Sequence, residues 1–338
     1  MKNSFTNSKD LFNQKLLSFL WRQWSAIGVA GHATNTDDWI IDPEALLLFS
    51  TEIARHDPRL FDEILDWLQL FGSRINLTRL KRIHKQKKLG SPSILAAIGE
   101  TLSQASIHHK WKSLTQLSTF DPIKDKPEPL FPQSLSFDWE KFKDQTDPYF
   151  LKHGWLRTSP EFRKMSQAPQ PHATTNLLFK LRALFGNQSR AEIIAWLLCH
   201  PHGHPAKITR DTHYSKRIIQ QTLNELETSG HIISRRSNKE KHFRIIHNQW
   251  EFLKPASGTS NASFPQWINW PSVFAALSAL HNTLSMPGID EASALFQAAK
   301  IRSALEQANL PLDFSTTSHK TGADFIEAVL KDFDTLLS

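Results

Sequence analysis

The sequence predicts a mainly α-helical protein that carries one short β-hairpin. Three observations indicate this fold class: apolar residues recur at helical spacing along most of the 338 residues, Asp-Pro pairs and glycines mark helix ends, and one stretch near residues 231–246 reads as two strands. No apolar run approaches the roughly 18 to 20 residues that span a bilayer, and the N-terminus lacks an apolar signal core. We therefore expect a cytoplasmic protein with no membrane partner.

Residues 1–116 predict an N-terminal helical domain. Pro43 and Pro58 each follow an aspartate, which is the pattern of an N-cap residue followed by proline at the first helical position. Amphipathic or largely apolar helices are expected at residues 9–24, 43–56, 58–71, 76–88 and 92–106. A domain of this size can bury a core of its own.

Residues 117–172 predict a connector without long helices. Eight of the 18 prolines lie between Pro122 and Pro171, which favours an extended chain over regular helices. Disordered linkers rarely carry many aromatic residues. We therefore expect the connector to be anchored on the surface by Trp139, Phe142, Tyr149, Phe150 and Trp155.

Residues 173–254 carry the clearest marks of helix starts and ends. The segment TNLLFKLRALFG ends at Gly186, and Ser189 with Glu192 has the spacing of a capping box. A short helix, HPAKITRDT, leads through HYS to the helix SKRIIQQTLNELETSG, and HIISRRSNKEKHFRII reads as a hairpin with a polar turn. The predicted order is helix, short helix, turn, helix and basic hairpin.

The helix at residues 215–226 has an unusual polar face. Its apolar face consists of Ile219, Thr222, Leu223 and Leu226, and its polar face of Arg217, Gln220, Gln221 and Asn224. An ordinary solvated face would be mostly Glu and Lys. Arg, Gln and Asn can make bidentate contacts with guanine and adenine edges in a major groove. We therefore predict that these four residues read bases.

Over residues 189–246 the sequence resembles bacterial winged helix-turn-helix regulators of the ArsR and MarR kind. The matching residues are Ile208 and Thr212 in the short helix, Tyr214 and Ser215 at the turn, Ile219, Leu223 and Leu226 in the long helix, and Gly230 before the hairpin. Two positions depart from the family pattern. Thr209 stands where a small alanine often packs, and His213 stands where the tight turn commonly has glycine.

The resemblance implies roles for the basic residues of this segment. Lys216 and Arg217 would lie at the start of the recognition helix, the end that enters the groove. The basic residues of the hairpin wing would contact backbone phosphates, which position the protein without reading sequence; these are Arg235, Arg236, Lys239, Lys241 and Arg244.

The net charge of +7 is concentrated in two segments. Residues 74–88 hold seven Lys or Arg and no acid, and residues 207–244 hold nine against four acids, so the rest of the chain is net negative. This concentration indicates a polyanion partner. The first segment is a possible second basic site, formed by Arg79, Arg82, Lys85, Lys87 and Lys88. It could also be part of a second helix-turn-helix or a solvated run of charge.

The sequence offers no convincing metal, cofactor or catalytic site. Cys199, His200, His202 and His204 are close together, but metal sites of this ligand type normally draw on two separated segments. Phosphate-loop, dinucleotide, zinc-protease and serine-hydrolase motifs are absent from the sequence. We therefore expect no metal, no cofactor and no enzymatic activity.

Residues 265–338 predict three helices rich in Ala and Leu, which is typical of packing or dimerising segments. Together with Trp21 and Trp24, they are the surfaces expected to form a homodimer whose recognition helices address half-sites about 34 Å apart or a multiple of that distance. The alternative is a monomer in which residues 74–88 supply the additional contacts. Nothing in these helices identifies an effector.

The function predicted from the sequence is sequence-specific binding of duplex DNA by a bacterial transcriptional regulator. The alternative is a protein-interaction subunit, such as an antitoxin or a phage-defence component, whose basic surfaces bind a protein or an RNA.

Overall fold

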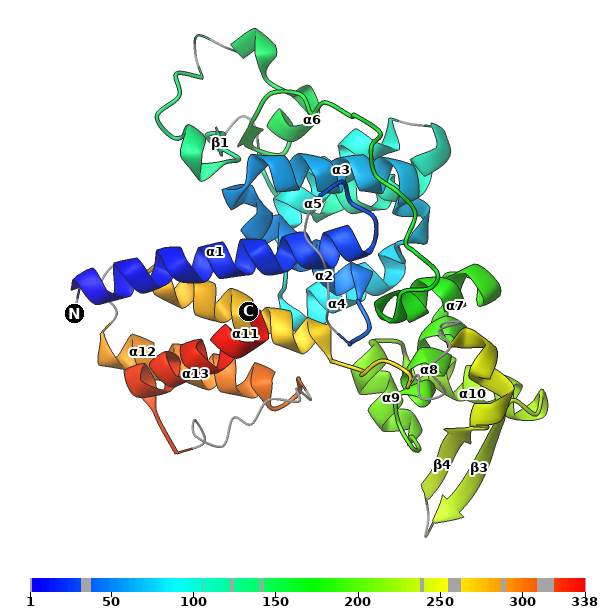
Figure 1. Ribbon diagram of the computed structural model, residues 1–338. Coiled ribbons are helices and arrows are strands. Elements are labelled where there is room, and N and C mark those ends of the chain that lie inside the picture. The colour runs from blue at the N-terminus through cyan, green and yellow to red at the C-terminus, as the bar shows by residue number, and fades with distance from the viewer. Residues whose placement is uncertain are drawn as a thin grey trace.

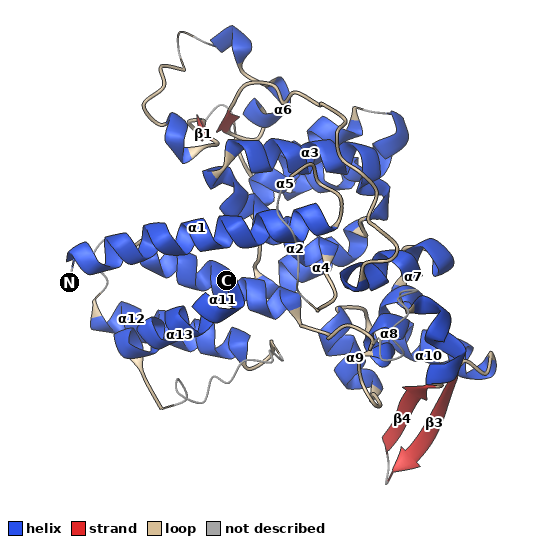
Figure 2. Ribbon diagram, viewed as in Figure 1, coloured by secondary structure: helices blue, strands red, loops and turns tan. Residues whose placement is uncertain are grey.

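The computed structural model shows a mainly helical protein (Figures 1 and 2). The structure describes residues 2–31, 38–104, 106–121, 125–139, 141, 143–237, 240–254, 263–286, 290–308 and 319–337. In this part of the chain, no helix combines the length and the apolar character needed to cross a membrane.

Four of the N-terminal helices begin within one residue of the predicted positions, whereas the first begins at Lys2 and not at residue 9. The N-terminal helices are α1 (Lys2–Ala26), α2 (Pro43–Ile53), α3 (Pro58–Phe71), α4 (Leu77–Lys87) and α5 (Pro92–Ser103), followed by the 3₁₀ helix η3 (Ser106–Leu117). The Asp42 carboxylate accepts the Ala45 N–H at 3.1 Å and Asp57 accepts the Leu60 N–H at 3.1 Å. These bonds satisfy N–H groups that the first helical turn leaves unpaired.

The C-terminal helices pack on the N-terminal ones in one core. They are α11 (Trp270–Leu284), α12 (Glu291–Leu305) and α13 (Gly322–Leu337). Helix α11 packs on α1 and α2, α13 packs on α1, and α12 packs on α11 and α13 (Figure 1). Phe274 of α11 stacks on Phe49 of α2 at 4.7 Å, and the Trp270 indole donates to the Ile40 carbonyl at 2.7 Å. The C-terminal region is therefore not a separate helical layer.

The surfaces expected to form a dimer are largely interior. Trp24 is fully buried and its indole donates to the Ser50 hydroxyl at 2.8 Å, while Trp21 donates to Asp57. The Ala and Leu residues of α11 are buried against α1 and α2. Packing within a chain avoids the entropic cost of association, so apolar faces that can meet inside one molecule do so. On α12, by contrast, Leu295 and Phe296 are exposed, so the predicted two-fold assembly would have to use this part of the C-terminal region.

Residues 177–253 form a second core. The elements are α7 (Leu177–Phe185), α8 (Ser189–Leu198), α9 (Pro205–Thr212), α10 (Lys216–Thr228), β3 (Ile232–Ser237), β4 (Glu240–Ile245) and η7 (His247–Leu253). Their buried side chains include Trp196, Ile219, Leu223 and Phe243. In Figure 1 this unit lies to one side of the helical body, and the β3–β4 pair projects from it.

The segment between the two cores is attached to the helical body. It contains the parallel pair β1 (Glu128–Pro129) and β2 (Trp155–Leu156) and the short α6 (Pro148–Leu151). Phe150 is fully buried, and the Trp155 indole donates to Ser93 at 3.1 Å. Trp139 and Tyr149 are half-buried, and Phe142 lies outside the described residues.

Gly28, which follows α1, contacts the chain at Gln167, near the end of this segment. Its φ is +104°, and a Cβ atom there would lie 2.0 Å from the Gln167 carbonyl oxygen. The Gln167 N–H donates to the Gly28 carbonyl at 2.7 Å. Only glycine permits so close an approach at this backbone angle.

Candidate nucleic-acid interface

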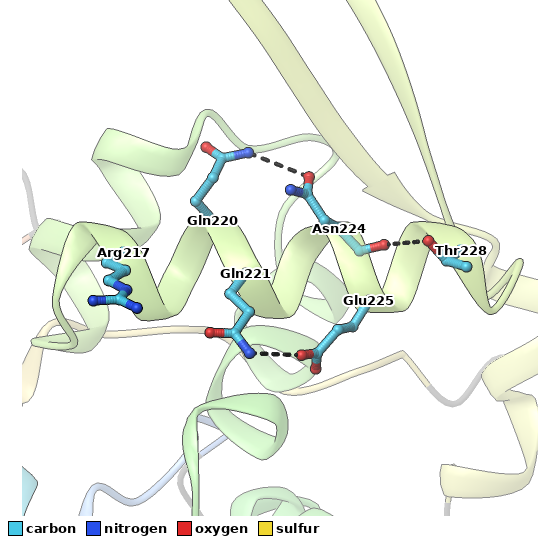
Figure 3. A pocket seen from close by; sticks show the side chains of 6 residues that line it. All are labelled: Arg217, Gln220, Gln221, Asn224, Glu225 and Thr228. Carbon is cyan, nitrogen blue, oxygen red and sulfur yellow. Dashed lines mark hydrogen bonds between the residues drawn. The ribbon is translucent and has the colours of Figure 1, made fainter.

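Helix α10 divides into the two faces that the sequence predicts. The Ser215 side chain caps its N-terminus by accepting the Ile218 N–H at 3.4 Å. Ile219, Thr222, Leu223 and Leu226 are buried in the second core. On the opposite face Arg217, Gln221 and Asn224 are exposed and Gln220 is half-buried, as is shown from close by in Figure 3. The four predicted base-reading residues therefore lie on one open face.

Hydrogen bonds organise the side chains of this face (Figure 3). The Gln220 amide donates to Asn224 Oδ1 at 3.3 Å, and the Gln221 amide donates to Glu225 Oε1 at 3.0 Å. The Thr228 hydroxyl donates to the Asn224 carbonyl at 2.9 Å. These six residues, Arg217 included, line an open depression on the surface. The face is thus an ordered row of donors and acceptors.

Glu225 is a member of this face that the sequence analysis missed. The Gln221 amide and the Arg190 guanidinium, 2.6 Å away, bind its carboxylate and lower its pKa. A carboxylate in this position can accept the N4 amino group of cytosine, and it disfavours a nearby phosphate. The signal in the sequence was its position four residues after Gln221, on the same side of the helix.

The basic residues of β3 and β4 divide between two faces. The register pairs Ile233 with Arg244, Arg235 with His242, and Arg236 with Lys241. Because opposed residues of an antiparallel pair share a face, Arg235 and Arg244 lie on one side and Arg236 and Lys241 on the other. Both faces carry predicted phosphate-binding residues.

The residues of β3 and β4 that are predicted to contact phosphate differ in their exposure and in their ion pairing. Arg235, Arg236 and Arg244 are exposed. Lys241 is half-buried and forms an ion pair with Glu227 of α10 at 2.5 Å, so its charge is already compensated. Lys239 lies outside the described residues. At the start of α10, Lys216 is exposed beside Arg217.

The segment between α8 and α9 pairs with β4. The Gly203 N–H donates to the Phe243 carbonyl at 2.8 Å, and the Phe243 N–H donates back at 2.9 Å. A Cβ atom on Gly203 would lie 2.3 Å from the Trp196 ring, so glycine is required for this approach. The edge of β4 that does not pair with β3 is therefore hydrogen-bonded to the loop between α8 and α9.

The prediction of a second basic site on α4 is largely wrong. Arg79 is only 1% exposed, and Lys87 donates to Ser272 at 2.8 Å and to Gln307 at 2.7 Å. Arg82 is half-buried and donates to the His213 carbonyl at 3.0 Å. Among the five residues predicted, Lys85 and Lys88 are exposed. The groups that bind Arg79, Arg82 and Lys87 come from other elements, so the sequence of this helix gave no sign of them.

Arg79 belongs to a buried charge network, formed by Asp42, Glu44, Arg79, Arg182 and Glu192. Arg79 binds Asp42 at 2.6 Å and 2.7 Å and Glu44 at 2.7 Å. Arg182 binds Glu44 at 2.7 Å and Glu192 at 2.5 Å. Three carboxylates thus surround two guanidinium groups, and the network joins α2 and α4 to α7 and α8.

The network also explains why the predicted capping box is wrong. Helix α8 begins at Ser189, whose hydroxyl bonds to Thr222 at 3.0 Å instead of capping the helix. Glu192 is fully buried and its carboxylate binds Arg182. Burial raises the pKa of Glu192, and Arg182 opposes this shift. Burial alone would lower the pKa of Arg182, but Glu44 and Glu192 raise it.

Helix α4 also holds the turn between α9 and α10. The Arg79 Nε donates to the Thr212 carbonyl at 2.9 Å, and the Asn76 amide donates to the Tyr214 hydroxyl at 2.9 Å. His213, with φ of +60°, is buried, and its Nδ1 lies 2.7 Å from the Gln86 side-chain oxygen. The left-handed conformation explains why the family pattern has glycine here, and histidine tolerates it.

The buried His213 predicts a loss of stability in acid. Burial, followed by the positive charges of Arg79 and Lys87, lowers its pKa from 6.5 to about 3. Between these values the unfolded chain binds more protons than the folded chain, so stability falls as the pH falls, by about 1.4 kcal/mol per pH unit.

This effect can be isolated with His213→Asn, because Asn accepts the left-handed conformation and does not titrate. From pH 6.0 to 4.5 the free energy of unfolding in urea should fall by about 2 kcal/mol less in the variant than in the original protein. Equal falls in both proteins would contradict the assignment.

The cysteine and histidine segment 199–204 is structurally divided. Burial raises the pKa of the Cys199 thiol to about 12, which makes it unreactive. The His200 ring stacks on Trp196 at 3.7 Å. Among the described residues, no group of three or more His, Cys, Asp or Glu side chains has the arrangement of a metal site.

Comparison with known proteins gives no relative: no family model, no curated protein and no solved structure matches the chain.

Proposed function

We propose that this chain binds duplex DNA sequence-specifically, as a cytoplasmic transcriptional regulator, with residues 189–246 acting as a winged helix-turn-helix. The observation that carries the proposal is the open polar face of α10. Arg217, Gln221 and Asn224 are exposed and Gln220 is half-buried, all on the side of the helix opposite its buried residues. Their donors and acceptors suit the base edges of a major groove.

The order of the elements around α10 supports this proposal. Helices α8, α9 and α10 are followed by the antiparallel pair β3–β4, and the segment containing Gly203 pairs with β4 between α8 and α9. In helix-turn-helix proteins the N-terminal residues of the recognition helix reach the bases. Lys216 and Arg217 occupy that end of α10.

The proposal assigns different tasks to the helix and the wing. The four residues of α10 read bases, whereas Arg235, Arg236 and Arg244 contact phosphates. Because α4 holds the turn before α10 through Asn76 and Arg79, the recognition helix keeps a fixed orientation relative to the helical body. Such preorganisation reduces the entropic cost of binding.

Two kinds of variant separate the two tasks. Arg217→Ala or Gln221→Ala should cost about 1 to 3 kcal/mol on the preferred duplex and little on random duplex. Arg236→Ala should weaken binding to both duplexes alike. The preferred duplex is obtained by selection from a random library, and affinities are measured by fluorescence anisotropy at one salt concentration.

The matched control is Lys331→Ala, because Lys331 is an exposed cation on α13, away from α10. Its affinity for both duplexes should be that of the original protein. Equal losses from the helix and wing variants on every sequence would exclude base reading by α10. Binding to a protein or RNA, with none to duplex DNA, would favour the interaction-subunit alternative.

A further inference from the structure

The outer face of the β3–β4 pair, which lies opposite its buried residues, gathers basic side chains. Ile232, Phe243 and Ile245 are buried in the second core. Successive residues of a strand point to opposite faces, so the opposed pairs Ile233 with Arg244 and Arg235 with His242 lie on the outer face. Figure 2 shows the two strands projecting beyond α8, α9 and α10.

The segment at Gly203 extends this outer face. Gly203 pairs antiparallel with Phe243, so His202 and His204 lie beside Arg244 and His242 respectively. The His202 and His242 rings are 5.4 Å apart, and the His204 and His242 rings are 5.7 Å apart. Three imidazoles and two guanidinium groups, those of Arg235 and Arg244, therefore meet on one surface.

This surface is concave. A cavity of about 900 Å³ is lined by β3, β4 and the loop between α8 and α9. Its lining residues are Pro201, His202, Ile233, Ser234, Arg235, Arg236, His242, Phe243 and Arg244. The His242 Nδ1 atom is shielded from solvent and has no hydrogen-bond partner among the described residues. Its ring therefore retains a nitrogen for which the described residues supply no partner.

The groups around the cavity are mostly basic. The Glu240 carboxylate lies 3.3 Å from the His242 Nε2 atom. Glu227 pairs with Lys241 on the inner face of the strands. A single described carboxylate at the outer face thus accompanies two arginines and three histidines.

We propose that this cavity binds a phosphate group. Arginine binds phosphate through two parallel N–H bonds, and hydrogen bonds to an anion are stronger than those between neutral groups. Arg235 and Arg244 would form such bonds, and the His202 and His242 rings would donate further ones. The site is separate from the base-reading face of α10. The phosphate can belong to a small molecule or to the DNA backbone.

The test measures pyrophosphate binding by isothermal titration calorimetry, in low salt at pH 6.5, with the full chain. Arg244→Ala and His242→Gln should each lower the affinity by about tenfold to a hundredfold. Lys331→Ala, which removes an exposed cation of α13, should leave it within about twofold. Binding should also shift the ring-proton NMR signals of His202, His204 and His242.

A second arm uses a duplex of random sequence to distinguish the two sources of phosphate. Loss of duplex affinity in Arg244→Ala and His242→Gln, without pyrophosphate binding by the original protein, would support the site and identify the DNA backbone as its ligand. Loss of pyrophosphate affinity alone would support a small-molecule ligand.

The proposal is overturned if Arg244→Ala and His242→Gln retain the original affinity for both ligands, if neither ligand binds, or if Lys331→Ala loses as much pyrophosphate affinity as they do. A failure of the proposed function would give a different result from a failure of this proposal. If the protein does not bind DNA, pyrophosphate binding that depends on Arg244 would still establish the phosphate site.

Discussion

Affinity for duplex DNA is expected to fall steeply as salt is added. With six to ten phosphate contacts the fall between roughly 50 and 200 mM salt is about 10³ to 10⁵-fold, because binding releases condensed counterions. Arg79, Lys87 and Lys241 are engaged within the protein, which places the expectation at the lower end of this range. The exposed candidates are Lys85, Lys88, Lys216, Arg217, Arg235, Arg236 and Arg244.

The measurement is the slope of log affinity against log salt concentration for a random duplex. This slope reports the number of phosphate contacts. Arg236→Ala should lower that number by about one, whereas Lys331→Ala should leave it unchanged. If Lys85→Ala also reduces the slope, the exposed end of α4 lies close enough to touch the same duplex. An absence of binding at about 50 mM salt would refute duplex DNA as the partner.

Glu44→Ala is expected to destabilise the fold strongly, because Glu44 lies at the centre of the buried charge network. Its carboxylate, fully buried in α2, binds both Arg79 and Arg182. Removing it leaves two buried guanidinium groups with two remaining acids, Asp42 and Glu192. The formal charges then balance, but N–H groups of Arg79, Arg182 and Asn76 lose their acceptor. Leaving several charged donors buried without partners should cost about 3 to 5 kcal/mol.

The control for this change is Lys15→Ala, which breaks the partly exposed pair with Asp334. Such surface pairs contribute about 0 to 1 kcal/mol. Free energies of unfolding in guanidinium chloride, followed by circular dichroism, compare the two variants. Because the network joins the two cores, Glu44→Ala should also separate their unfolding into two transitions. A loss no larger than that of Lys15→Ala would show that the network does not stabilise the fold.

Helix ends and helix faces were predictable because their causes are local. Asp42 and Asp57 cap the helices that follow them, and the position of each residue around α10 fixes which side chains are buried. An N-cap side chain bonds the N–H two or three residues further on, and a helical face repeats every 3.6 residues. Both patterns are visible in a short stretch of sequence. The open face with Arg217 and Gln221 followed from the same local rule.

The fate of α4 could not be predicted in this way. Its cations look outward-facing when counted along the helix, but Arg79 meets acids of α2 and Lys87 meets side chains of α11 and of the segment after α12. Glu192 likewise has the spacing of a capping residue and instead binds Arg182. In each case the deciding partner is distant in sequence, and burial makes pairing with it obligatory.

The sequence alone therefore determined the helical class, most helix starts and the polar face of α10, since these depend on neighbours within about one turn of helix. Only the tertiary structure decided which charges are free. The basic segment at residues 74–88 joins the helical body to the turn before α10, and His202 and His204 meet His242 because the chain pairs at Gly203. Charges buried between elements must be compensated by whatever the fold brings beside them, and that depends on contacts far apart in the chain.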